Sequence, residues 1–151
     1  MKKAILALVG SIILFIVVIF ISIHIETSKY ELAVKHYKAK EFDKAMSYFK
    51  KECEFADFNA CGFVGVMYLK GEGVEVDFST AVTYFEKGCK GTNFYTCSIL
   101  GMMYENGHGV KKDSQKAIQF HTKACEKNIM ESCEYVKKIE ENQNNKTSRT
   151  K

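Results

Sequence analysis

The sequence lacks the motifs on which several common kinds of chemistry depend. It contains six cysteines but no C-x-x-C pair, the spacing that zinc sites and thiol–disulfide catalysts usually use. It has only four histidines, and they form no H-x-H-x-D cluster, so a metal-dependent hydrolase is not indicated. We therefore expect neither a metal nor a cofactor.

An excess of positive charge is also missing. The chain has 22 lysines and arginines against 18 aspartates and glutamates. Without Lys2 and Lys3, which precede an apolar run, 20 basic residues remain against the 18 acidic ones, a net charge of about +2. A basic patch or stripe is the electrostatic signature of nucleic-acid binding. We predict that the chain has no nucleic-acid partner.

No charge occurs between Ala4 and Ile23, twenty residues that read AILALVGSIILFIVVIFISI. As a helix with a rise of 1.5 Å per residue, this run spans roughly 30 Å, the hydrocarbon thickness of a bilayer. It is compatible with an uncleaved signal anchor or with a cleaved signal peptide, whose apolar region usually has about 7 to 15 residues. This run is longer than that, and the residues at its carboxyl-terminal end contain no small-x-small cleavage pair. We therefore favour an uncleaved membrane-spanning anchor, formed by residues 1–27.

The cysteines indicate the compartment. Six cysteines in matched pairs are typical of proteins that fold where disulfides form. We therefore expect an exported protein, on the periplasmic side of the inner membrane if the anchor is uncleaved and otherwise secreted or extracellular.

The chain aligns with itself when it is shifted by 36 residues, which is the signature of a repeat architecture. GVMY at Gly65–Tyr68 aligns with GMMY at Gly101–Tyr104, and the turn sequence G-x-G-V-x-x-D occurs at 71–77 and again at 107–113. Besides both cysteine columns, four others align: Ala45, Ala81 and Ala117; Lys51, Lys87 and Lys123; Tyr48, Tyr84 and Phe120; and Phe49, Phe85 and His121.

Each repeat has the apolar pattern of two helices. Phe42, Ala45, Phe49 and Cys53 recur at intervals of three and four, which gives one apolar helix face, and a second such pattern begins at Cys61. The glycine at the start of each G-x-G turn is expected to end the second helix in a left-handed conformation, and the aspartate at its end to cap the next helix. These positions are Gly71 and Asp77 in the first turn and Gly107 and Asp113 in the second.

These patterns predict an all-α fold, an α/α hairpin repeat solenoid, or superhelix, with one disulfide per repeat. The domain from 28 to 141 is divided into a capping helix at 28–40 and three repeats at about 42–77, 78–113 and 114–141. The third repeat replaces the small and aromatic packing positions by polar residues, as a terminal capping helix requires. The polar tail 142–151 has nothing to bury, and we expect it to be disordered.

The cysteines in each repeat are eight positions apart. In an unbroken helix they would be separated by about 12 Å of rise, whereas a disulfide needs Cα atoms within about 7 Å. The chain must therefore turn between bridged partners, and turn-prone residues such as Asp57, Asn93 and Asn128 lie between them. Six cysteines allow fifteen pairings, of which the period selects Cys53 with Cys61, Cys89 with Cys97, and Cys125 with Cys133.

The residues from Lys38 to Ile139 resemble Sel1-like repeats, relatives of the tetratricopeptide repeat. The added C-x7-C pair resembles that of the Helicobacter cysteine-rich protein family. This resemblance implies a right-handed superhelix of α/α hairpins, each with one disulfide, in an exported protein. Several members of that family are labelled candidate beta-lactamases or penicillin-binding proteins. His121, where the first two repeats have Phe, departs from the pattern.

The beta-lactamase label has little support in the residues. Ser47-Tyr-Phe-Lys50 fits S-x-x-K, but its equivalents in the later repeats do not, and neither S-D-N nor K-T-G occurs. A second match, Ser148–Lys151, lies in the polar tail. We interpret His108 as a solvated turn residue and His121 as a packed or surface histidine. Whether the chain is an enzyme remains open, with beta-lactam hydrolysis or penicillin binding as the alternative function and no catalytic residue assigned.

The function that we favour from the sequence is binding. Stacked helical hairpins offer a concave wall that suits a protein, a peptide or a cell-envelope ligand such as a peptidoglycan fragment. A solvated or packing face would show the same residues. The candidates for the wall lie on the first helix of each repeat and are Lys44, Tyr48, Lys51, Tyr84 and Lys87.

Overall fold

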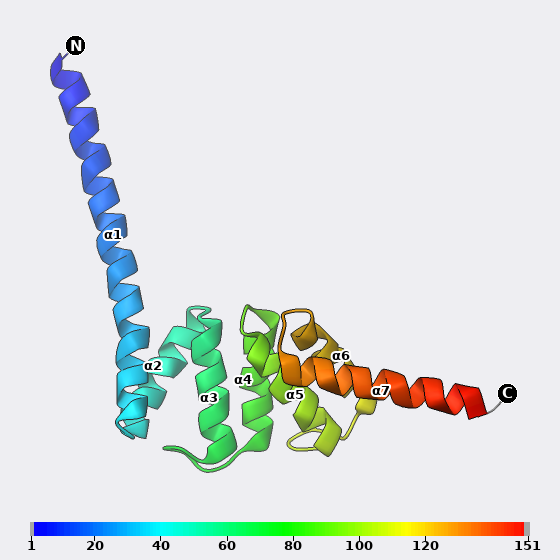
Figure 1. Cartoon of the computed structure of the whole chain (residues 1–151). Coiled ribbons are helices and arrows are strands. Elements are labelled where there is room, and N and C mark those ends of the chain that lie inside the picture. The colour runs from blue at the N-terminus through cyan, green and yellow to red at the C-terminus, as the bar shows by residue number, and fades with distance from the viewer. Residues whose placement is uncertain (1, 150–151) are drawn as a thin grey trace. The chain divides into compact units, whose positions relative to one another are not determined.

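The structure, a computed structural model, describes the backbone of residues 2–149 and the side chains of residues 9–21 and 29–141. In this part of the chain every regular element is a helix, as predicted (Figure 1). The helices are α1 (Lys2–Lys38), α2 (Phe42–Glu54), α3 (Phe58–Lys70), α4 (Phe78–Lys90), α5 (Phe94–Asn106), α6 (Ser114–Cys125) and α7 (Met130–Arg149).

The chain divides into two compact units, Met1–Tyr48 and Phe49–Lys151, with the division inside α2. The first unit contains α1 and the first turns of α2. The second contains the end of α2 and all later helices. Each unit is described separately below.

In the first unit, the end of α1 packs against the start of α2. The ring of His36 stacks on Tyr48 with 5.7 Å between centroids, and Ala33 and Ala45 are fully buried. His36 Nδ1 also shares a short hydrogen bond with Glu41, and this bond, together with the charge of Lys44, holds the pKa of Glu41 below its ordinary value. The helix predicted at 28–40 is thus the carboxyl-terminal part of the longer helix α1.

The membrane-spanning prediction for the apolar run is not supported by the structure. In the part of the chain that it describes, no helix is both long and apolar enough to cross a bilayer. The predicted span 4–23 lies partly outside the described side chains, which in this run extend only from Val9 to Ile21.

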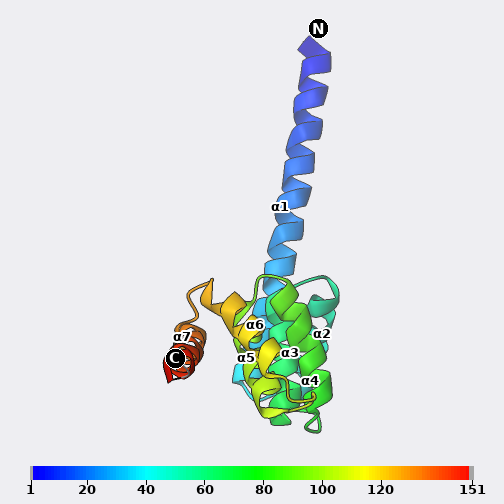
Figure 2. The same cartoon turned by 90° about the vertical axis from the view of Figure 1, so that its right-hand side faces the viewer.

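The second unit is a stack of helices (Figures 1 and 2). Helix α3 packs most extensively against α4 and α5 against α6, while the α4–α5 and α6–α7 contacts are smaller. Phe85 and Leu100 are fully buried at its centre, and Val64 and Met67 are fully buried on α3. Helices α4 and α6 bury one face, whereas α3 and α5 bury residues around much of their circumference. The unit is an all-helical repeat solenoid.

The G-x-G turns position successive helices as the sequence predicts. Gly71 has φ 73° and Gly107 has φ 76°, the left-handed conformation that favours glycine, and their N–H groups donate to the carbonyls of Met67 and Met103. Asp77 and Asp113 then cap α4 and α6 with side-chain oxygens that accept from backbone N–H groups. The two turns are therefore structurally equivalent.

Three disulfides join the predicted pairs of cysteines, and no cysteine is free. Their Cα atoms lie 4.7, 4.9 and 4.6 Å apart, because the chain turns between the partners. Left-handed residues Ala56 and Asn128 make two of these turns possible. The bridges connect α4 to α5 and α6 to α7, which are the smaller helix contacts of the stack, and α2 to α3.

The end of the chain differs from the prediction. Helix α7 continues to Arg149, through most of the segment 142–151 that we expected to be disordered. No proline or glycine follows Met130, so nothing in the sequence breaks the helix.

Candidate binding surface

Two tyrosines stack between α3 and α4 in the second unit. The rings of Tyr68 and Tyr84 lie 5.9 Å apart between centroids and are within 14° of parallel. Lys50 lies over the Tyr68 ring at 5.2 Å and Lys87 lies over the Tyr84 ring at 5.1 Å. We call these four residues the tyrosine–lysine cluster. Both rings are only partly buried, so the cluster presents cations and aromatic edges to solvent.

Lys50 is fixed within this cluster by a hydrogen bond. Its Nζ donates to the Tyr68 hydroxyl over 2.9 Å. This hydrogen bond raises the pKa of Lys50 above its ordinary value, with burial acting weakly in the other direction. The lysine therefore remains a cation and a hydrogen-bond donor, and it is a poorer proton acceptor than a free lysine.

The same arrangement recurs one repeat later. Tyr104 stacks on Phe120 with 5.4 Å between centroids, and Lys116 lies over the Tyr104 ring at 5.0 Å. These are the positions equivalent to Tyr68 and Tyr84, with the cation supplied from the start of α6 instead of from α2. The repeat thus places an aromatic pair with a lysine over it at both of these junctions.

The structure brings together only part of the predicted wall. Tyr84 and Lys87 are in the tyrosine–lysine cluster. Lys44 and Tyr48 belong to the first unit, where Lys44 pairs with Glu41 at 3.4 Å and Tyr48 stacks on His36. Lys51 is exposed at the end of α2.

Two members of the cluster were missed by the reasoning from sequence. In the sequence, Tyr68 stood out only within the aligned GVMY stretch, and Lys50 only within the S-x-x-K match. The recurrence of tyrosine at 68 and 104, with aromatic residues at 84 and 120, was the signal available for the stacked pairs. Nothing in the sequence pairs Lys50 with Tyr68, because the contact joins residues 18 positions apart.

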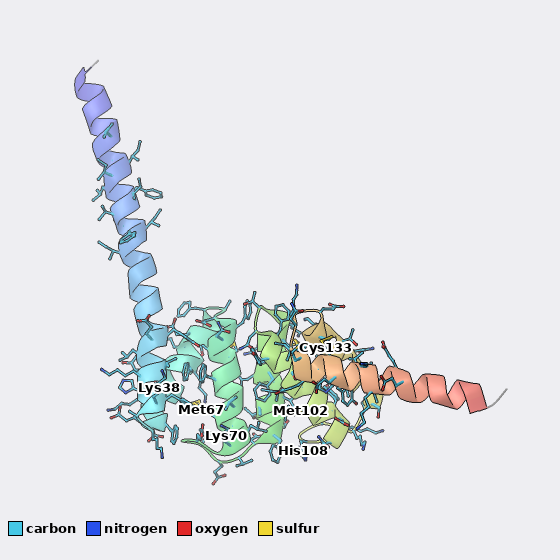
Figure 3. The ribbon with its side chains drawn as sticks, viewed as in Figure 1. Lys38, Met67, Lys70, Met102, His108 and Cys133 are labelled. Atoms are coloured by element: carbon cyan, nitrogen blue, oxygen red, sulfur yellow. A yellow bond between two sulfur atoms is a disulfide. The ribbon has the colours of Figure 1, made fainter. Side chains whose placement is uncertain are left out.

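The contacts of Lys50 do not favour the S-x-x-K match as a catalytic pair. A lysine that activates a serine must accept its proton, and the contacts of Lys50 hold it protonated instead. The second match, Ser148–Lys151, lies outside the described side chains. His108, in the loop after α5 (Figure 3), is exposed and stacks on Phe78 at 5.5 Å.

His121 belongs to the core of the second unit. Only 3% of it is exposed, and burial lowers its pKa below the ordinary value despite the opposing charge of Glu105. Its Nδ1 lies 3.0 Å from the hydroxyl of Ser132, which in turn donates to Ser98 over 2.9 Å. His121 is therefore a packed histidine. The two serines of this hydrogen-bonded chain were not predicted from the sequence. Ser132 is the repeat equivalent of Ala60 and Thr96, which are also buried.

The part of the chain that the structure describes has no group of three histidine, cysteine or acidic side chains that could hold a metal ion. All six cysteines are in disulfides, so their thiols are not available as metal ligands.

The fold and the disulfide-bridged turns define the class of the protein: a helical repeat protein with disulfides between its helices. The family model of the Sel1 repeat matches residues 59–93 and 96–129. The first matched repeat contains α3 and α4, and the second contains α5 and α6. The disulfide between Cys89 and Cys97 therefore lies at the boundary between the two repeats. The chain therefore carries two Sel1 repeats, and it is similar to the Helicobacter cysteine-rich proteins.

Relatives and solved structures agree with this assignment. HcpC of Helicobacter pylori, named as a candidate beta-lactamase, is 43% identical over 44 residues, which are 29% of this chain and only 15% of that protein. Cysteine rich protein B of the same species has a TM-score of 0.60 at 26% identity over 73% of this chain and 93% of that one. A Sel1 repeat protein from Oxalobacter formigenes has a TM-score of 0.67 at 27% identity, over 70% of this chain and 43% of that one.

Proposed function

We propose that this chain is an exported, disulfide-stapled repeat module that binds a protein or peptide through the tyrosine–lysine cluster and its copy in the next repeat. The observation that carries the proposal is the Tyr68–Tyr84 stack with a lysine over each ring. The disulfides and the relation to Helicobacter cysteine-rich proteins support export. A periplasmic or a secreted location fits the proposal equally.

The chemistry of the cluster suits protein recognition. Tyrosine gives a large, rigid contact area with one polar end, and it is enriched in the parts of interfaces that carry most of the binding energy. The lysines add donors that the aromatic rings hold in place, which reduces the side-chain entropy lost on binding. Helical repeats present such residues along an extended surface, as repeat proteins that bind other proteins do.

Beta-lactam hydrolysis is not proposed as a second function. The label belongs to a relative that matches this chain over 44 residues only. In this chain the lysine of the S-x-x-K match is engaged with Tyr68.

The proposal is tested by affinity capture from an envelope extract with the oxidised protein as bait. Two double variants each change two of the four residues of the cluster. One combines Lys50→Ala with Tyr84→Ala, and the other combines Tyr68→Phe with Lys87→Ala. We expect the unchanged bait to recover a specific protein and both variants to recover much less of it.

A matched control keeps the charge change but leaves the cluster intact. Lys70 and Lys90 are exposed lysines on α3 and α4, and the change of either one alone to alanine removes one charge, as each cluster variant does, and should leave recovery unaltered. Equal recovery by the cluster variants and the unchanged bait would contradict the proposal, as would recovery of nothing above a reduced-protein bait.

A further inference from the structure

A pocket of about 530 Å³ lies beside the second G-x-G turn, where that turn meets the start of α6. Its volume falls within the range of roughly 300–1,000 Å³ that is typical of ligand pockets. Tyr104 and Val110 give it an apolar wall. Its lining consists of Tyr104, Val110, Lys111, Lys112, Asp113 and Lys116.

The charge of this pocket is not required by the fold. The equivalent residues in the first G-x-G turn are Glu75, Val76 and Thr80, where the pocket has Lys111, Lys112 and Lys116. The two turns nevertheless have the same glycine conformations, and the aspartate of each turn caps the next helix with its side chain. The three lysines are therefore specific to this turn.

Within the described side chains, no carboxylate lies within 4.0 Å of any of these three lysine nitrogens. Asp113, the acidic residue of the lining, is used by the helix cap, since its Oδ1 accepts from the N–H groups of Gln115 and Lys116 at 3.0 Å each. The amino-terminal end of α6 adds the positive end of the helix dipole, which disfavours nearby cations. The pocket therefore concentrates positive charge that the chain itself does not balance.

We propose that this pocket binds an acidic peptide segment of a partner protein, with glutamate or aspartate carboxylates on the lysines and an apolar side chain against Tyr104 and Val110. This inference rests on the proposed function and names the chemistry of its partner. Lys116, held 5.0 Å from the Tyr104 ring centroid, joins the pocket to the aromatic pair of Tyr104 and Phe120. The apolar wall and the small net charge of +4 favour a peptide over nucleic acid, which needs a more extended basic surface.

The test measures fluorescence anisotropy of a labelled short peptide of glutamate and leucine, added to the full oxidised chain. Matched probes are the same peptide with glutamine in place of glutamate and a single-stranded DNA oligonucleotide. We expect the glutamate peptide alone to bind, and its binding to weaken as salt is raised, because exposed charges are screened. Equal binding of the glutamine peptide or of the oligonucleotide would overturn the proposal.

The decisive variant gives the second turn the residues of the first. The combined change Lys111→Glu, Lys112→Val and Lys116→Thr uses residues that the same fold already carries in the first turn. It should weaken glutamate-peptide binding by about tenfold or more, since it removes three charge pairs of modest strength. A control of equal charge change on exposed lysines, Lys70→Glu, Lys90→Thr and Lys138→Thr, should bind nearly as the unchanged chain does.

A measurement on the unchanged chain does not depend on how the variants fold. The glutamate peptide should protect Lys111, Lys112 and Lys116 from acetylation, read by mass spectrometry, while Lys70 and Lys90 stay reactive. Protection of all five lysines alike would contradict the pocket as the site. If the peptide does not bind but capture still depends on the tyrosine–lysine cluster, the acidic-peptide inference fails and the proposed function stands.

Discussion

Gly65 lies directly against the ring of Phe85. A Cβ atom added at Gly65 would be 2.6 Å from two ring carbons, closer than such contacts occur in folded proteins. Gly101 stands in the same relation to His121 one repeat later, where the nearest ring atoms would be 2.5 Å away. Glycine at these positions therefore lets α3 approach α4, and α5 approach α6, closely enough to bury the aromatic residue.

The first prediction concerns this close approach. Gly65→Ala should lower the free energy of unfolding by about 1–3 kcal/mol, because Phe85 is fully buried and the added methyl overpacks its site. Denaturant unfolding of the oxidised protein measures the change. Gly10→Ala is the control, since a Cβ there meets nothing within 4 Å. Equal stability of Gly65→Ala and the unchanged protein would contradict the packing described here.

The second prediction concerns the disulfide between α4 and α5. Replacing Cys89 and Cys97 together by alanine should lower the free energy of unfolding by about 2.5 kcal/mol, because a short closed loop is released in the unfolded chain. The disulfide between Cys125 and Cys133 closes a loop of the same length, so the double alanine variant at these positions should lose a similar amount. If both double variants unfold at the same midpoint as the oxidised parent, the disulfides do not stabilise the fold and the prediction is wrong.

The third prediction concerns pH. The pKa of His121 is lowered by burial, so the unfolded chain binds a proton more readily than the folded one. The contribution of His121 to the free energy of unfolding should be fully present above about pH 6.5, the ordinary pKa of histidine. It should be lost as the pH falls through the lower pKa of the folded state. The groups facing the ring are Glu105, whose charge acts in the opposite direction, and Tyr135, which packs on it at 4.1 Å between centroids.

His121→Phe tests the assignment, because Phe49 and Phe85 already occupy the equivalent positions. Thermal unfolding across this pH range should show a weaker decline at low pH in this variant than in the parent. His108→Gln removes an exposed histidine and should keep the decline. A decline that persists unchanged in His121→Phe would assign it to another group.

The fourth prediction concerns hydrolysis. The oxidised protein should not turn over a chromogenic cephalosporin above the uncatalysed rate, because Lys50 is held protonated by the Tyr68 hydroxyl. Turnover that is lost on Ser47→Ala would show that the S-x-x-K match is catalytic after all. Turnover that survives Ser47→Ala but is lost on unfolding would reveal a different site.

The repeat, the helix stops and the disulfides could be predicted because each depends on a local pattern. A glycine in a left-handed turn, an aspartate cap and a cysteine interval of eight are all visible within a few residues, and the period of 36 repeats them. The extent of α7 could not be predicted in the same way. Polarity alone suggested disorder beyond residue 141, whereas the absence of a helix breaker decided the outcome.

The binding surface was only half predictable for a different reason. Tyr84 and Lys87 are on one helix and could be found from its period, but Lys50 and Tyr68 join them through packing between helices. The buried chain of hydrogen bonds from His121 through Ser132 to Ser98 likewise joins residues 34 positions apart. Such contacts depend on how the helices stack, which no local pattern records.

The most direct test of the account is site-specific photo-crosslinking in the native envelope. p-Azidophenylalanine in place of Tyr84 keeps an aromatic ring in the stack, and the same group in place of Tyr95, an exposed tyrosine on α5, serves as the control. We predict that position 84 gives a discrete crosslinked protein and that position 95 does not. Crosslinks at position 95 alone, or at neither position, would contradict a binding function for the tyrosine–lysine cluster.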